Sequence, residues 1–140
     1  MKIFELKRLP SWQDMECEAT RIGLEGCEVF KILDDATKKK EWNGIGSDSM
    51  SKRLRHFFDS LFVEALSGAY IHDLRFVIGG SKEQFHETNS ELKRNLYKCL
   101  RYYRKNYSLV GYWITKIEIN IAVWLCNRYG YEGWRNKIEP

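Results

Sequence analysis

Proline is nearly absent from this chain, and its cysteines are few and widely spaced. Only two of the 140 residues are proline, which favours long uninterrupted helices over a loop-rich fold. The four cysteines, Cys17, Cys27, Cys99 and Cys126, form no C-x-x-C motif. This spacing argues against a zinc site and against a dense disulfide framework. We therefore expect free thiols in a reducing compartment.

The chain also lacks an apolar leader and a strong excess of one charge. Its first ten residues, MKIFELKRLP, carry charges throughout, so we expect no signal peptide and synthesis in a cytoplasm. Lys116 and Glu118 interrupt the apolar run 110–126, so no uncharged stretch reaches membrane-spanning length. The net charge of +4 is too weak to indicate nucleic acid, but it suits an anionic membrane surface.

The length and composition predict one domain, 1–140, with a mainly α fold and a loop-rich N-terminal region. The alternation at 4–7 and the β-tolerant run 28–33 admit a short β-hairpin there. The charged run 34–41 is expected to form an exposed loop. The segment that follows it, WNGIGSDS at 42–49, is expected to form a tight turn that exposes the backbone.

Apolar residues that recur every three or four positions predict three helices in the rest of the chain. The first runs from about residue 52 to Gly79-Gly80, which ends it. The second begins at Ser81, which forms a capping-box pattern with Gln84. The third covers 109–129, and its large apolar residues are expected to face inward: Val110, Trp113, Ile114, Ile117, Ile121, Trp124 and Leu125.

His72 and Asn89 are strongly polar residues on the apolar stripes of the first two helices. The short Gly-Gly link makes these two long helices antiparallel neighbours. His72 lies seven residues before Gly79 and Asn89 lies eight after Ser81, so each is roughly 10–12 Å from the turn. We therefore predict a hydrogen bond between them, since an unpaired buried polar group costs about 1–3 kcal/mol.

Three motifs occur in order between residues 42 and 92. They are the loop Asn43-Gly44-Ile45-Gly46-Ser47, the pair His72-Asp73 followed by Phe76 and Gly79-Gly80, and Asn89 on the next helix. This set resembles the phospholipase A2 superfamily, most closely its compact bacterial and phage-borne branch. In that branch a glycine loop precedes a helix with a His-Asp pair, and a second helix carries Asp or Asn.

The resemblance implies Ca²⁺ as cofactor and hydrolysis of a glycerophospholipid ester as activity, and so a role in lipid degradation. The ion would be held by the backbone carbonyls of Trp42, Gly44 and Gly46 and by the carboxylate of Asp73. Hard oxygen ligands of this kind suit calcium. Glycine allows the carbonyls of a tight loop to converge on an ion.

The resemblance also assigns the catalytic roles. His72 would be the general base that takes a proton from water, and Asn89 would orient its ring. The Gly44 N–H would add a donor to the oxyanion. Two positions depart from the family pattern: Asn89 stands where Asp is usual, and Phe76 stands where Tyr is frequent. An amide cannot stabilise an imidazolium by charge as a carboxylate does.

Two non-enzymatic interpretations stand beside the esterase. The first is a non-catalytic phage virion or assembly protein that retains the scaffold, with virion proteins as partners. The second is a helical interaction module whose basic stretch 52–56 binds an acidic partner. A lone histidine on an apolar face is more often a core residue. The neighbouring Asp73, the glycine turn and Asn89 favour function, with a phospholipid or membrane surface as partner.

Overall fold

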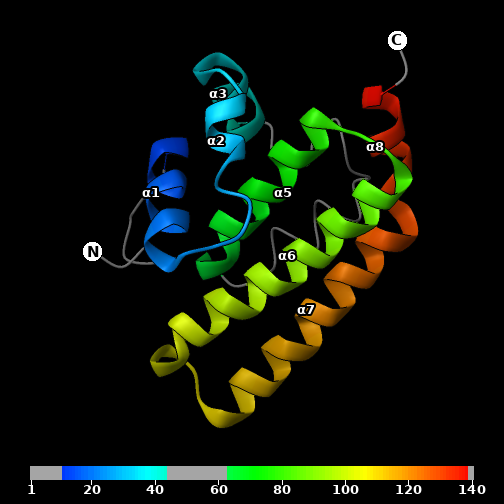
Figure 1. Ribbon diagram of the computed structural model, residues 1–140. Helices are drawn as coiled ribbons and strands as arrows, with labels where there is room; N and C mark the ends of the chain where they lie inside the picture. Colours follow the sequence, from blue (N-terminus) through cyan, green and yellow to red (C-terminus); the bar gives the residue numbers. More distant parts are fainter. Residues whose placement is uncertain (1–10, 44–62, 139–140) are drawn as a thin grey trace.

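The computed structural model of the protein describes residues 11–43 and 63–138 (Figure 1). Within these stretches the regular structure is helical and no strand occurs, which confirms a mainly α fold. The elements are α1 (Trp12–Ile22), α2 (Val29–Ile32), α3 (Asp35–Asn43), η2 (Val63–Ala65), α5 (Leu66–Ile78), α6 (Lys82–Tyr102), η3 (Arg104–Asn106), α7 (Leu109–Tyr129) and α8 (Tyr131–Ile138).

The described N-terminal residues are helical where loops and a short strand were expected. Helix α1 begins at Ser11, whose hydroxyl accepts a hydrogen bond from the Asp14 N–H at 3.2 Å. The Asp14 carboxylate accepts one from the Ser11 N–H at 2.8 Å. This reciprocal capping satisfies donors that a helix start leaves unpaired. The S-x-x-D spacing was the signal in the sequence that the expectation missed.

The prediction of a β-tolerant run at 28–33 and an exposed loop at 34–41 is wrong. Val29–Ile32 forms α2, and most of the charged run lies in α3. Asp34 accepts a hydrogen bond from the Thr37 N–H at 2.7 Å. The Lys38 side chain is buried and donates to Glu16 at 2.6 Å, whereas Asp34, Asp35, Lys39 and Lys40 are exposed, as expected. The alternation at 4–7 and the turn beyond Asn43 lie outside the described residues.

Helix α5 lies at the centre of the molecule, with α1 to α3 on one side and α6 and α7 on the other (Figure 1). Its residues from Ser67 to Leu74 are all buried. The first predicted helix is described only from Leu66 onward, preceded by the short η2, because 52–62 lie outside the described residues. The central position of α5 places its polar residues inside the protein.

The link between α5 and α6 has the glycine turn and the helix cap that the sequence predicts. Gly79 and Gly80 have φ values of 72° and 142°, which only glycine adopts without strain. The Ser81 hydroxyl accepts from the Gln84 N–H at 3.2 Å, and the Gln84 side chain accepts from the Ser81 N–H at 2.6 Å. The predicted capping box is thus confirmed, and α6 lies beside α5 after a three-residue link (Figure 1).

Helix α7 exposes most of the residues that were expected to face inward, so that prediction is wrong. Its buried residues are Thr115, Ile119, Ala122, Val123 and Cys126. Six large apolar residues, which we call the outer face of α7, are 45–68% exposed: Val110, Trp113, Ile114, Ile117, Ile121 and Trp124. Large apolar residues lie on opposite sides of this helix, so the periodicity of the sequence could not identify the side that packs on α6.

Gly26 packs closely against α5 and α6. Its backbone conformation and its surroundings leave no room for a side chain. Its φ is 92°, and a Cβ there would lie 2.8 Å from both Ile71 Cγ2 and Glu91 Oε1. We expect Gly26→Ala to lower the free energy of unfolding by at least about 2 kcal/mol, through backbone strain and overpacking. Urea unfolding measures the change.

Gly68→Ala is the matched control for this prediction. Gly68 lies within α5, and its added Cβ would be 3.4 Å from Leu96 Cδ2, an ordinary contact. Because alanine is the better helix former by about 1 kcal/mol, this variant should be at least as stable as the wild type. Equal stability of the two alanine variants would contradict the close packing around Gly26.

Candidate functional site

His72 and Asn89 meet between α5 and α6, as predicted. The distance between His72 Nε2 and Asn89 Oδ1 is 2.8 Å. Both side chains are buried, with 2% and 0% of their surface exposed. Their contact follows from the equal distance of the two residues from the Gly-Gly turn, and it confirms the geometric prediction. Their catalytic roles stay a prediction.

Asn89 forms a second hydrogen bond, with a residue of α7. Asn89 Nδ2 donates to Asn127 Oδ1 at 2.8 Å, so the other amide atom, Oδ1, faces His72 as an acceptor. In the neutral ring, Nε2 therefore carries the hydrogen and Nδ1 is the basic nitrogen. His86 Nδ1 lies 3.3 Å from Asn127 Oδ1 and extends the chain of contacts to the surface. Sequence reasoning missed Asn127.

The surroundings of His72 keep its ring neutral. Burial lowers its pKa from 6.5 to about 4, and the hydrogen bond that His72 Nε2 donates to Asn89 Oδ1 opposes that shift. The Phe76 ring lies 4.7 Å from the imidazole, centroid to centroid, so an aromatic side chain contributes to the apolar environment. At neutral pH the imidazole is in the form that can accept a proton.

Asp73 is a buried carboxylate in an uncompensated position. Its residue is 3% exposed, and its Oδ2 has no hydrogen-bond partner within 11–43 and 63–138. Burial, and to a smaller extent the charge of Glu41, raise its pKa from 3.8 to about 8. An uncompensated buried charge is costly unless a cation or proton accompanies it, so this hard oxygen donor fits a cation such as Ca²⁺.

Tyr70 lies one helical turn before Asp73 and repeats this pattern. Its buried hydroxyl also has no hydrogen-bond partner among the described residues. Burial raises the pKa of the phenol well above its ordinary value. Helix α5 thus carries two buried oxygens that lack a hydrogen-bond partner in the described part of the chain.

Trp42, the first residue of the predicted calcium loop, lies against the same part of α5. Trp42, at the end of α3, is buried, and its ring meets the Tyr70 ring edge-on at 5.6 Å. Gly44 and Gly46, the other two predicted carbonyl ligands, lie outside the described residues. The side chains of the described part form no group of three or more metal-ligating residues. A calcium site here would therefore need ligands beyond the side chains of the described residues.

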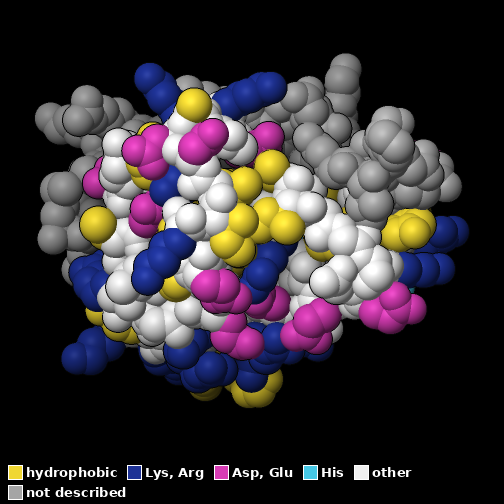
Figure 2. All heavy atoms as spheres, turned by 45° about the horizontal axis from the view of Figure 1, so that its top comes forward, with side chains coloured by type: hydrophobic (Ala, Val, Ile, Leu, Met, Phe, Trp, Pro, Cys, Tyr) yellow, Lys and Arg dark blue, Asp and Glu magenta, His cyan; other side chains and the backbone are white. Residues whose placement is uncertain are grey.

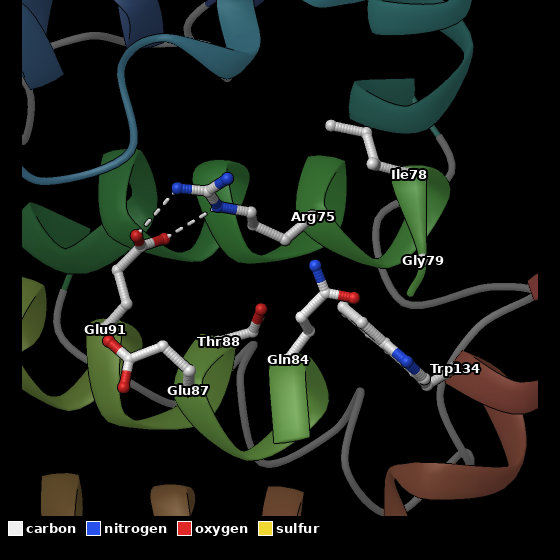
Figure 3. A pocket seen from close by; sticks show the side chains of 8 residues that line it. All are labelled: Arg75, Ile78, Gly79, Gln84, Glu87, Thr88, Glu91 and Trp134. Carbon is white, nitrogen blue, oxygen red and sulfur yellow. Dashed lines mark hydrogen bonds and ion pairs between the residues drawn. The ribbon is translucent and has the colours of Figure 1, made fainter. Parts of the chain in front are cut away.

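A pocket of about 190 Å³ lies beside the α5–α6 pair, near Gly79. Figure 3 shows Arg75 from α5 reaching over to the Glu91 carboxylate of α6, at 3.1 and 2.9 Å. Arg75 also bonds Glu28, at 2.8 Å. The Arg75–Glu91 pair links α5 to α6. His72 and Asp73 do not line this pocket.

Comparison of the chain with protein-family models, curated proteins and solved structures finds no match in any of the three. The site is therefore assigned from its own geometry. A neutral imidazole held at Nε2 by an amide is followed by a carboxylate with an unsatisfied oxygen. This arrangement can take up a proton at one position and a cation at the next.

Proposed function

We propose that this chain is a calcium-dependent esterase that hydrolyses a glycerophospholipid ester. One observation carries the proposal: His72, kept neutral by burial and hydrogen-bonded to Asn89, immediately precedes Asp73, whose buried oxygen lacks a partner among the described residues. A base and a cation ligand on successive helical positions are the two elements that such a hydrolysis needs. The site would lie on two long antiparallel helices, α5 and α6.

His72 Nδ1 would take the proton of a water molecule as its oxygen attacks the ester carbonyl. The same nitrogen would then return the proton to the oxygen of the leaving lysophospholipid. Asn89 would hold the ring through Nε2 during both transfers. Because the Asn89 amide is neutral, it orients the imidazolium without stabilising its charge as a carboxylate would.

Asp73 would hold the calcium ion, together with the carbonyls of Trp42, Gly44 and Gly46. The ion, when bound, supplies Lewis-acid polarisation of the ester carbonyl. The Gly44 N–H would donate to the developing oxyanion. Two observations support this assignment: the orphaned Asp73 oxygen, and Trp42 in contact with the Tyr70 ring one turn away on α5.

A second candidate is a non-catalytic virion or assembly protein that retains the scaffold. The burial of His72 and its hydrogen-bond chain through Asn89 to Asn127 favour it. Buried, satisfied polar networks of this kind also serve to specify a single packing of a helical core. Under this alternative, His72 variants change stability and there is no esterase activity to lose.

Hydrolysis of a fluorescent phospholipid by the wild-type chain, with and without a calcium chelator, tests the proposal. We expect turnover to fall at least about a hundredfold in the chelator, because electrostatic stabilisation of the oxyanion is lost. Excess Ca²⁺ should restore it. Mg²⁺ is the control ion, since it demands shorter octahedral coordination and should restore little.

Two results would contradict the esterase. The first is turnover that the chelator does not change, which would exclude calcium from the chemistry. The second is the absence of turnover above background in excess Ca²⁺, which would favour the scaffold alternative.

A further inference from the structure

The outer face of α7 is a continuous apolar surface on the side of the helix opposite its packed side. Val110 and Trp124 are fourteen residues apart, so the face extends about 21 Å along the helix. All six of its residues are 45–68% exposed, although they include two tryptophans and three isoleucines. Soluble monomers seldom leave so large an apolar patch in water, which indicates that a partner covers it.

The part of the chain that contains most of α6 and all of α7 is strongly basic. Between residues 92 and 129 the chain has eight lysines and arginines and one acidic residue, Glu118, giving +7. The whole chain carries only +4, so the rest of it is net acidic. Figure 2 shows one face of the molecule on which Lys and Arg side chains gather along the lower edge, beside hydrophobic ones.

Cations also lie directly at the border of the apolar face. Lys116 Nζ is 4.6 Å from the centroid of the Trp113 ring and 5.4 Å from that of Tyr112. The Arg104 guanidinium is 4.3 Å from the Tyr112 ring. Long basic side chains that run beside exposed aromatic rings are typical of helices at a lipid–water boundary.

We propose that the outer face of α7 docks on an anionic phospholipid bilayer, with the helix lying in the plane of the membrane. Aliphatic residues and tryptophan would enter the boundary between headgroups and acyl chains, and the surrounding cations would contact lipid phosphates. An anionic bilayer therefore accounts for both features, the apolar face and the cations beside it.

Two other occupants and a membrane-spanning orientation of α7 fit these observations less well. A second copy of the chain would bring Lys116 and Arg104 of both copies toward one interface, which like-charge repulsion opposes. A nucleic acid would leave the branched aliphatic residues in water, since bases stack on aromatic rings. Helix α7 is long and apolar enough to cross a membrane, but its other side is packed against α6 through Ile119 and Val123.

The docking face adjoins the candidate site without depending on its chemistry. Asn127, whose side chain bonds Asn89, follows Trp124 by three residues on the same helix. Docking through α7 would thus hold the His72 region near lipid. Binding requires no ester hydrolysis, so it can be measured with calcium removed.

Sedimentation with vesicles, in the presence of chelator, tests the proposal. The wild type should bind vesicles containing phosphatidylserine at least about tenfold better than pure phosphatidylcholine, and high salt should weaken the binding. The double variant Ile117→Ser/Trp124→Ser should lose at least about tenfold in affinity. Ile32→Ser, at a 61% exposed isoleucine of α2, is the matched control and should bind as the wild type does.

Several outcomes would overturn the docking assignment. Equal vesicle binding by the double variant and the wild type would do so. So would a wild-type dimer that the double variant dissociates, without vesicle binding, or RNA binding in place of lipid binding. Resistance of bound protein to alkaline carbonate would indicate a spanning helix instead. Loss of docking with unchanged hydrolysis of a dispersed short-chain phospholipid would separate this result from a failure of the esterase proposal.

Discussion

Asp73→Asn is expected to stabilise the metal-free protein at pH 8 and to abolish its stabilisation by calcium. The carboxyl has a pKa of about 8 in the folded protein against an ordinary value of 3.8, chiefly because it is buried. A raised pKa means that the folded state keeps a proton which the unfolded state has lost. Its contribution is fully present below pH 3.8 and is lost as the pH rises toward 8.

The pH window between 6.5 and 8 isolates this effect. His72 titrates in the opposite sense: its pKa is lowered to about 4 from 6.5, so its contribution is lost as the pH falls below 6.5. Between pH 6.5 and 8, Asp73 alone should lower the free energy of unfolding by about 2 kcal/mol in the wild type. Asp73→Asn should show no such fall in urea unfolding with chelator present.

Calcium should reverse the loss in the wild type and leave the asparagine variant unchanged. At a hundred times its dissociation constant, a ligand that binds only the folded state adds about 2.7 kcal/mol. Glu41→Gln is the matched control: the charge of Glu41 is the smaller cause of the raised Asp73 pKa, so most of the pH dependence should remain. A wild type whose stability is flat from pH 6.5 to 8 would contradict the uncompensated carboxylate.

His72→Gln is expected to reduce phospholipid turnover by about 10²- to 10⁴-fold, the range that loss of a general base produces. Glutamine keeps an amide hydrogen for the contact with Asn89, so the variant should stay folded. In the wild type, kcat/KM should fall with acid only near pH 4, since the His72 pKa is lowered to about 4. Stopped assays across pH 3.5 to 8 measure both effects.

Two further variants separate a base from a core residue. Asn89→Asp places a carboxylate beside the imidazole, which should raise the His72 pKa and move the acidic limb of the profile to higher pH. A purely structural role for His72 would leave that limb in place. His86→Gln, at an exposed histidine near the surface, is the control and should retain wild-type turnover. Equal turnover in His72→Gln and the wild type would exclude general-base catalysis.

The sequence by itself determined the features that depend on local geometry. The capping box at Ser81, the end of α5 at Gly79 and the bounds of α7 all follow from the conformations that short stretches of residues adopt. The His72–Asn89 contact is nearly local as well: a link of three residues and a fixed helical rise place the two side chains at one height. The cap at Ser11 is equally local, and its S-x-x-D spacing predicts it from the sequence.

Only the tertiary structure decided which surfaces meet. Helix α7 has large apolar residues on opposite sides, so its sequence could not distinguish Ile119, packed on α6, from Ile117, which faces water. The pairing of Asn89 with Asn127 likewise depends on the rotation of α7 against α6. The unsatisfied oxygen of Asp73 is defined by what surrounds it from other helices. Periodicity specifies that a helix has an apolar side, whereas contacts between distant segments select the side that is buried.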